Sequence, residues 1–278
     1  MENNPSNAFR NFEHEGWQKA AGHYDLGFGA VTSQAVDSLL SAAAVRSGIR
    51  LLDVACGPGY VALAAARLGC SVVGIDFSSE MITRAKEMPQ DATWDLEFRE
   101  GDAENLTFPD GSFDAVVMNF GMLHLALPDR AIAEAFRVLK PGGRYAFAVW
   151  DAPPKTAGFE IVLDAVRTHG NVNVPLPEGP LFFRFSDPFE SVRSLTAVGF
   201  EGIKTVVVPQ VWFLKAGVDL FQTIRRAAVR TAALLNMQSP EALVNIEREI
   251  SEKAERYRTP AGIELPMPAI LTSAVRPA

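Results

Sequence analysis

The stretch Leu51-Leu52-Asp53-Val54-Ala55-Cys56-Gly57-Pro58-Gly59 decides the fold. Its apolar first half predicts a buried strand over residues 50–55, and its glycines predict a tight turn that opens a helix over residues 60–68. Glycines let the backbone approach a ligand closely, and a helix N-terminus presents unpaired N–H groups. The turn also fits the Gly-x-Gly-x-x-Ala pattern of dinucleotide-binding proteins over Gly57–Ala62, and it fits an ordinary strand-to-helix connection.

Short β-branched runs alternate with helical patterns from this unit up to Trp150, which indicates a parallel sheet built from β-α units. Further strands are predicted at residues 71–76, 94–99, 113–119 and 144–150. Doubly wound sheets bind ligands beyond the carboxyl ends of their strands. The segments expected to share one such site are 53–60, 76–81, 102–104, 119–124 and 150–151.

The second half of the chain is less regular. It shows a helical pattern at 159–168, a Pro- and Phe-rich loop, and a helix that Asp187-Pro188 opens with a cap and a first-turn proline. Strands are predicted at 202–214 and 263–275, with helices at 218–236 and 240–256. We expect these two helices to be inserted between the last two strands, which would pair antiparallel.

The expected architecture is therefore a doubly wound, Rossmann-like α/β fold with a mostly parallel seven-stranded sheet, an antiparallel last strand and a helical cap. We divide the chain into four parts: an N-terminal helical lid segment (1–45), a cofactor-binding core (46–152), a cap region with a core helix (153–200), and the last two strands with their inserted helical pair (201–278).

Composition narrows the function. The 278 residues carry a net charge of −7, and the one dense basic cluster (Arg225, Arg226 and Arg230) is interpreted as a solvated helix face, so a nucleic-acid partner is not expected. Two cysteines cannot form a disulfide framework, the first ten residues lack a signal-peptide core, and no apolar run reaches the length of a membrane span. These features favour a cytoplasmic protein. The sequence gives no signal for the oligomeric state.

Two further acidic residues end neighbouring strands. Asp76 lies 23 residues after Asp53, and a carboxylate there can accept hydrogen bonds from both hydroxyls of a ribose, although it could simply cap the next helix. Asp102, in Gly101-Asp102-Ala103-Glu104, could read the amino edge of an adenine, or be a solvated turn residue. Because parallel strands end at one edge, these carboxylates are expected to meet.

Five motifs in order resemble those of class I methyltransferases. They are the opening stretch, Gly74-Ile75-Asp76-Phe77-Ser78, Gly101-Asp102-Ala103-Glu104, Phe108-Pro109-Asp110-Gly111-Ser112-Phe113-Asp114 and Arg137-Val138-Leu139-Lys140-Pro141-Gly142-Gly143. The set is most similar to the group around the ubiquinone and menaquinone biosynthesis methyltransferases and covers residues 48–150. The resemblance implies S-adenosyl-L-methionine as cofactor, S-adenosyl-L-homocysteine as product, and transfer of a methyl group to a small molecule.

The resemblance also implies roles for single residues. Asp53, Ala55 and Gly57 would line the methionine end, Gly59 would support the cofactor from the turn, and Asp76 would hold the ribose. The other implied contacts are Phe77 and Met81 beside adenine, Asp102 and Ala103 at its edge, Asn119 and Gly121 at the amino-acid portion, and Tyr24 closing over the cofactor. Ala55 departs from the glycine that the family often has. Asp53 is expected to point into the space above the turn, where it would repel a pyrophosphate.

Methyl transfer to a hydroxyl or an acidic carbon also requires a base. His124, on the loop after the fourth strand, is the first candidate, and its alternative role is to shape that loop. His169, at the end of a cap helix, ranks second. The four histidines and two cysteines do not cluster, so no metal is predicted.

Aromatic residues suggest an apolar or aromatic acceptor. Phe182, Phe183, Phe185 and Phe189 lie in one proline-rich segment, and we expect Trp150 and Trp212 to contribute with them. Such a loop packs as a lid or lines a pocket. Two alternative functions remain open at this point: a nicotinamide-dependent oxidoreductase that uses the glycine turn, and a non-catalytic regulator that binds the cofactor. Neither the acceptor nor the acceptor atom is encoded in a motif.

Overall fold

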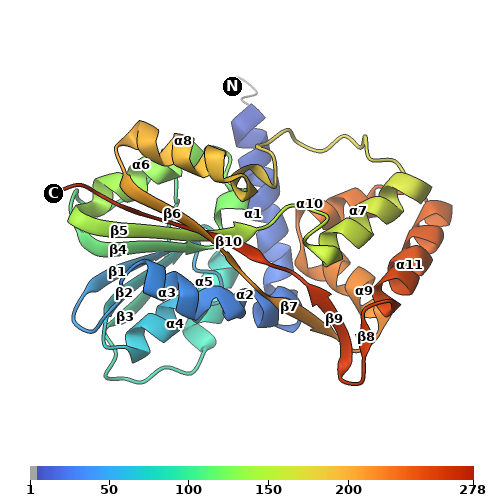
Figure 1. Cartoon of the computed structure of the whole chain (residues 1–278), viewed down its shortest axis with the longest axis horizontal. Coiled ribbons are helices and arrows are strands. Elements are labelled where there is room, and N and C mark those ends of the chain that lie inside the picture. Colours follow the sequence, from blue (N-terminus) through green and yellow to red (C-terminus); the bar gives the residue numbers. More distant parts are fainter. Residues whose placement is uncertain (1–4) are drawn as a thin grey trace.

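The computed structural model describes residues 5–278 and centres on a seven-stranded sheet (Figure 1). Its strand order is β3-β2-β1-β4-β5-β10-β6, and β10 alone runs antiparallel to its neighbours. The strands are β1 Arg50–Val54, β2 Ser71–Asp76, β3 Leu96–Glu100, β4 Phe113–Asn119, β5 Leu139–Trp150, β6 Glu201–Val208 and β10 Ala269–Val275. The expected fold class is confirmed. Residues 1–4 of the predicted N-terminal segment lie outside the described residues.

Helices cover both faces of the sheet (Figure 1). They are α3 Val36–Ala42, α4 Tyr60–Arg67 and α5 Ser79–Glu87 toward one side, and α6 Pro128–Val138 and α8 Pro188–Val198 on the other. Local sequence fixes where they begin. The Ser78 hydroxyl accepts a hydrogen bond from the Met81 N–H and caps α5. The Asp187 carboxylate accepts one from the Phe189 N–H and caps α8, as predicted.

The central strands β1 and β4 are buried on both faces. Leu51, Leu52, Val116 and Val117 are completely inaccessible to solvent, as expected where helices pack on both sides of a parallel sheet. The strand order reverses between these two strands, because β2 and β3 lie on one side of the pair and β5 on the other. The carboxyl ends of β1 and β4 therefore lie at the point where doubly wound folds bind ligands.

A separate helical cap carries a small three-stranded sheet of order β7-β9-β8 (Figure 1). Its elements are α7 Ala157–His169, β7 Val211–Leu214, α9 Gly217–Ala227, α10 Arg230–Asn236, α11 Pro240–Glu255, β8 Arg258–Thr259 and β9 Gly262–Pro266. A short turn of 3₁₀ helix, η4 Arg184–Ser186, lies in the loop before α8.

Three predicted elements in this half of the chain were wrong. The expected strand 202–214 is divided into β6 and β7, and the expected strand 263–275 into β9 and β10, in each case between two different sheets. Pro209 and Pro268 stand at the breaks, and a proline has no N–H to continue a ladder. The expected helix 218–236 is two helices, α9 and α10.

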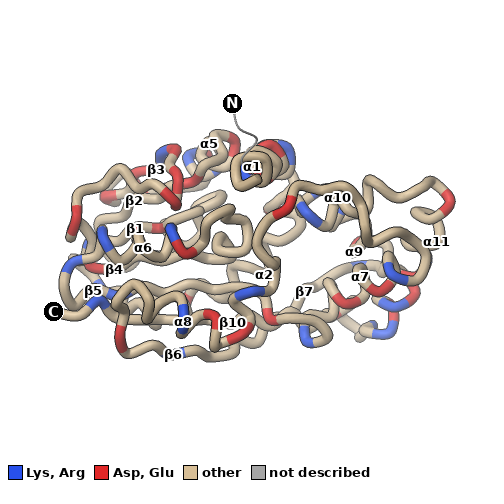
Figure 2. Tube along the Cα trace, turned by 90° about the horizontal axis from the view of Figure 1, so that it is seen from above, with Lys and Arg blue, Asp and Glu red and all other residues tan. Residues whose placement is uncertain are grey.

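Helix α1 (Pro5–Tyr24) runs between the sheet and the cap and packs against α5 and α9 (Figure 1). The chain then passes through a π-helical turn, η1 Asp25–Gly29, and two short helices, α2 Ala30–Thr32 and η2 Ser33–Ala35. Lys and Arg are interspersed with Asp and Glu along the trace (Figure 2). Among residues 5–278, every helix is too short or too polar to span a lipid bilayer.

Candidate cofactor and acceptor site

One cavity lies where α1, the cap and the carboxyl ends of the strands meet, and it holds about 1070 Å³ of empty space including its mouth. The cavity contains most of the residues that the sequence singled out. The predicted residues that line it are Tyr24, Ala55, Gly57, Asp76, Phe77, Met81, Asp102, Ala103, Asn119, Gly121 and His124.

A hydrogen bond joins the glycine turn to Asp76. Asp76 Oδ2 accepts a hydrogen bond from the Gly57 N–H at 2.9 Å, and Oδ1 accepts one from the Ser78 N–H at 2.9 Å. The Gly59 N–H donates to the Cys56 carbonyl. The N–H groups of both turn glycines are therefore already used. Burial raises the pKa of the Asp76 carboxyl to about 6, against the lowering effect of these N–H donors.

Asp53 and Gly59 do not line the cavity. Asp53 is completely buried, and its Oδ2 accepts a hydrogen bond from the Ala62 N–H in the first turn of α4, so the expectation that it points into the space above the turn was wrong. Among residues 5–278, Oδ1 of Asp53 has no hydrogen-bond partner, and burial raises the pKa of the carboxyl to about 8. Gly59 has a left-handed backbone, φ +88°, and a Cβ there would lie 2.7 Å from the Phe98 ring.

Asp102 is held by a side chain that the sequence did not single out. Arg10, on α1, donates to Asp102 Oδ2 at 2.6 Å and also pairs with Glu104. Glu104 is buried, and its other oxygen accepts hydrogen bonds from the N–H groups of Ala126 and Leu127. This network joins α1 to the loops after β3 and β4.

Asn119 lines the cavity and has an unused acceptor. Its amide nitrogen donates to the Thr32 carbonyl at 3.1 Å, while its Oδ1 is buried and has no hydrogen-bond partner within residues 5–278. The backbone is closely packed here. Ala55 has φ +54°, and a Cβ added at Gly121 would lie only 2.6 Å from the Cβ of Ala55. Gly121 thus accommodates the methyl group that Ala55 adds. A buried acceptor without a donor calls for a ligand that carries one.

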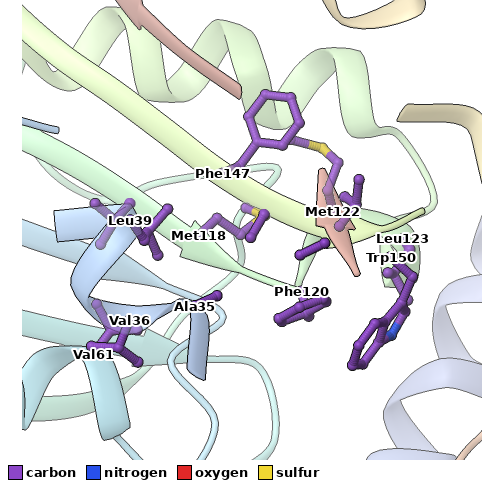
Figure 3. Packing of buried hydrophobic residues seen from close by; sticks show 14 of the residues in the cluster. Ala35, Val36, Leu39, Val61, Met118, Phe120, Met122, Leu123, Phe147 and Trp150 are labelled. Carbon is purple, nitrogen blue, oxygen red and sulfur yellow. The ribbon is translucent and has the colours of Figure 1, made fainter. Parts of the chain in front are cut away.

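One wall of the cavity is aromatic, with rings from the strand ends and from the cap. Phe120 and Trp150 pack with ring centroids 4.1 Å apart at the ends of β4 and β5 (Figure 3). Phe28, Phe159 and Phe182 also line the cavity. The remaining aromatic residues of the prediction lie elsewhere. Trp212 packs behind Phe28 at 4.8 Å, Phe185 is in the core, Phe183 packs against Phe159 and Phe182, and Phe189 is 83% exposed.

Tyr24 lies among aromatic rings at the cavity wall. Its ring is 5.9 Å from that of Trp17 and 6.5 Å from that of Phe28, and its hydroxyl lies 3.2 Å from Thr32 Oγ1. Burial raises the pKa of this phenol to about 12. Tyr24 is therefore neutral near pH 7, and electron-rich ring faces surround this part of the cavity.

His124 belongs to a buried ionic cluster. Its Nδ1 lies 2.9 Å from Glu13 Oε2, and the other oxygen of Glu13 accepts a hydrogen bond from Arg230 Nε at 2.6 Å. Glu13 is completely buried. The interpretation of Arg230 as part of a solvated face was wrong, because its side chain is only 16% exposed and lies on α10, whereas Arg225 and Arg226 are exposed on α9.

Neither Glu13 nor Arg230 was found from the sequence, although Glu13 had a signal. It interrupts a stripe of α1 that otherwise carries apolar residues at a spacing of about four, from Phe9 through Trp17 to Tyr24. His169 lies outside the cavity, where its Nε2 pairs with Glu249 of α11. The structure thus removes the geometric basis for His169 as a base. Within residues 5–278, no group of His, Cys, Asp and Glu side chains is placed to hold a metal ion.

Comparison with known proteins agrees with this geometry. Residues 52–147 match a family described as a methyltransferase domain. The chain is 41% identical over 110 residues to a demethylmenaquinone methyltransferase of Thermus thermophilus, covering 39% of this chain and 50% of that one. It is 30% identical over 187 residues to an uncharacterized protein of Mycobacterium tuberculosis, covering 67% and 66%. The chain spans about half the length of the curated demethylmenaquinone methyltransferases that it matches.

Solved structures share the fold at low sequence identity. YcgJ of Bacillus subtilis superimposes with a TM-score of 0.56 at 23% identity, over 88% of this chain and 98% of that one. The phosphoethanolamine N-methyltransferase 2 of Haemonchus contortus, in complex with S-adenosylhomocysteine, gives 0.59 at 20% identity, over 97% and 60%. The [4+2]-cyclase SpnF gives 0.52 at 23% identity, over 88% and 81%. The fold alone therefore leaves the reaction open.

An acidic residue at the end of β2, a glycine turn after β1 and a cavity at the strand-order reversal define a nucleoside-cofactor-binding α/β protein. Together with the match over residues 52–147, they identify the class of this part of the chain. Residues 52–147 form a class I S-adenosylmethionine-dependent methyltransferase domain that is related to the menaquinone methyltransferases.

Proposed function

We propose that this protein transfers a methyl group from S-adenosylmethionine to a small molecule with an apolar or aromatic body. The observation that carries the proposal is a single cavity with polar acceptors at the sheet edge and aromatic rings on the cap side. The first wall suits a nucleoside with an amino-acid arm, and the second suits an acceptor. An in-line displacement needs both molecules in one enclosed space.

The acceptors at the sheet edge fit the donors of this cofactor. Asp76 retains lone pairs that ribose hydroxyls can use, and the unpartnered Oδ1 of Asn119 suits the ammonium of the amino-acid arm. We assign Ala103, Phe77 and Met81 to the adenine ring, because they line the cavity beside Asp102 and Asp76. Tyr24 and Trp17 would face the sulfonium, whose positive charge is attracted by aromatic faces. The bound cofactor supplies the electrophilic methyl group.

The nicotinamide alternative gains no support from the site. A pyrophosphate requires free N–H groups at the glycine turn, whereas those of Gly57 and Gly59 are bonded to Asp76 and Cys56. The buried carboxylate of Asp76 would also repel a phosphate placed there. The repulsion of a pyrophosphate that was expected from Asp53 would therefore come from Asp76.

The partner is proposed to be a small molecule and not a nucleic acid, because the net charge is −7 and Arg230 is used inside the protein. We also propose a cytoplasmic location, since both cysteines are unpaired and buried, as is usual in a reducing compartment.

Binding and transfer test the proposal together. Calorimetry should show that the protein binds S-adenosylhomocysteine and that Asp76→Ala weakens binding at least about tenfold, since a hydrogen-bonded charged partner is lost. Asp95→Asn is the control, because Asp95 is exposed and far along the chain from the turn. S-adenosylmethionine with a labelled methyl group should label at least one member of a panel of naphthols, catechols, amines and thiols.

Two results would overturn the proposal. Binding of NADH without binding of S-adenosylhomocysteine would make the protein an oxidoreductase. Binding of S-adenosylhomocysteine with no label transferred to any panel member would favour the regulatory alternative.

A further inference from the structure

We infer that Glu13 and His124 form a general-base pair for an acceptor whose nucleophile is an aromatic hydroxyl, and that Arg230 positions the pair. This inference rests on the proposed function and adds to it the acceptor's reacting group. It assigns His124 as a catalytic residue, and Glu13 and Arg230 as positioning residues that act through it.

The hydrogen bond between Glu13 and His124 defines which ring nitrogen is available. A carboxylate only accepts, so the 2.9 Å contact with Glu13 Oε2 requires the proton on Nδ1 of His124. The other nitrogen, Nε2, is then the basic one. Within residues 5–278 it makes no hydrogen bond to the protein, and His124 lines the cavity. A basic nitrogen is therefore available to a molecule bound there.

Arg230 fixes the pair from the cap side. Besides Glu13, its guanidinium donates to the carbonyls of Pro180 and Leu123 at 2.7 Å each, and it lies 4.3 Å over the ring of Phe9. One side chain of α10 thus joins α1, the loop before η4 and the loop after β4. Each oxygen of the buried Glu13 side chain thus has a partner, as buried polar groups require.

The surroundings of His124 indicate the shape of its substrate. Its ring meets that of Trp17 edge-on at 4.7 Å and that of Phe182 at 6.1 Å. Phe120, Trp150 and Phe159 continue this wall. A flat ring fits between such faces, and a hydroxyl on it would be the group that reaches Nε2. An amine acceptor carries its own lone pair and would not need the base during attack.

Proton transfer to His124 accompanies methyl transfer to the acceptor oxygen. The acceptor O–H gives its proton to His124 Nε2, and an oxygen lone pair forms the new bond to the methyl carbon. The methyl–sulfur bond breaks, and its electron pair stays on sulfur as a neutral thioether. His124 becomes an imidazolium, which Glu13 stabilises, and it then releases the proton to water. The positive charge of the sulfonium ends on that proton.

A chromogenic acceptor tests the pair without turnover. With S-adenosylhomocysteine present, 4-nitro-1-naphthol should bind wild-type protein largely as its coloured naphtholate at a pH where the His124→Asn variant binds it as the neutral form. The expected shift is a tenfold or larger change in the bound ionisation ratio, about one pKa unit. The Glu13→Gln variant should lose most of this shift in the ionisation of the bound naphthol. Equal ionisation in wild type and His124→Asn would overturn the inference.

Turnover of a hydroxylated acceptor is the second readout. His124→Asn should lower kcat about 100-fold or more while S-adenosylhomocysteine affinity is unchanged. Glu13→Gln should lower kcat at least about tenfold, with the loss growing as the acceptor hydroxyl becomes less acidic, since the charged orienting group is gone. A merely structural Glu13 would give a loss independent of acceptor acidity, and that result would overturn its role.

His169→Asn is the matched control, because it breaks the other histidine–glutamate pair, outside the cavity. It should change neither readout. Methyl transfer by wild type to amines or thiols, but to no hydroxylated aromatic, would overturn this inference while leaving the methyltransferase proposal intact. Failure to label any acceptor would overturn the methyltransferase proposal itself.

Discussion

The sheet edge and the cap build opposite walls of one cavity with different kinds of bonds. At the sheet edge, carboxylates accept mainly from backbone N–H groups: Asp76 from those of Gly57 and Ser78, and Asp102 from that of Glu104, although Asp102 also pairs with Arg10 of α1. On the cap side, side chains pair with side chains over long separations, as in Arg230 with Glu13, 217 residues apart. The first wall therefore depends mostly on bonds within one part of the chain, and the second exists only after α1 and α10 have come together.

This difference suggests how the two walls divide their work. A site made from backbone donors changes little when surrounding side chains change, so it suits a cofactor that a whole family shares. A site made from paired side chains can be rebuilt by a few substitutions. The match over residues 52–147 covers the sheet edge and not α1 or α10. The acceptor should therefore be decided by α1, α10 and the aromatic loop.

The largest expected effect is on the cap. Arg230→Met leaves the buried Glu13 without its strongest partner, and breaking a buried ion pair from one side costs about 4 kcal/mol. Urea denaturation should show this loss in the free energy of unfolding. Arg226→Met is the control and should change it by less than about 0.5 kcal/mol, because Arg226 is exposed. Equal losses in both variants would mean that the cap does not depend on this cluster.

The next effect is on the sheet edge. Gly59→Ala places a Cβ 2.7 Å from the Phe98 ring at φ +88°, so both strain and overpacking apply, and the free energy of unfolding should fall by about 3 kcal/mol. Gly48→Ala separates the two causes. Gly48 has φ +81° with open space around it, so its substitution should lower the free energy of unfolding by about 1 kcal/mol, through strain alone. If the two variants lose the same stability, the close packing of the turn against β3 is not limiting.

The same contrast explains what the sequence could predict. The bounds of β2 and β4 match the predicted residues, because periodicity and turn residues act over short distances. Most predicted cavity residues follow strand ends and were found for the same reason. Alternation continues across Pro209, so a strand that leaves one sheet for another looks uninterrupted in sequence.

The ionic cluster was missed for a different reason. Arg230 stands near Arg225 and Arg226 in sequence and shares their chemistry, and only its pairing with Glu13 of a distant helix distinguishes it. Asp53 was placed at the right edge but with the wrong orientation, since its bond to the Ala62 N–H depends on how α4 is packed. Long-range partners of polar side chains leave little trace in local patterns.

A smaller effect should appear as pH dependence at the sheet edge. Burial raises the folded-state pKa of Asp53 from 3.8 to about 8, so the folded protein holds this proton more tightly than the unfolded chain does. The contribution of Asp53 to the free energy of unfolding is fully present below the unfolded-state pKa of 3.8. It is lost progressively as the pH rises from there to about 8. The stability of Asp53→Asn relative to wild type should therefore rise between pH 5 and pH 8, by on the order of 3 kcal/mol.

Urea denaturation of wild type and of Asp53→Asn at several pH values measures this difference. The difference at the most acidic pH serves as the reference. Asp95→Asn, at an exposed position, should keep the wild-type pH dependence. A variant difference that stays constant with pH would show that Asp53 titrates alike in the folded and unfolded states. Asp76, whose pKa is raised to about 6, adds a smaller loss of stability with rising pH.

The smallest effect concerns the second histidine–glutamate pair. His169→Gln removes the contact with Glu249, but Glu249 keeps Lys253 at 2.5 Å, and both groups lie near solvent on α7 and α11. Pairs of this kind contribute about 0–1 kcal/mol, so unfolding should change by less than about 1 kcal/mol and methyl transfer should not change. A loss of transfer comparable to that of His124→Asn would mean that the cap acts on the cavity as one unit. The distinction between a pair inside the cavity and one outside it would then fail.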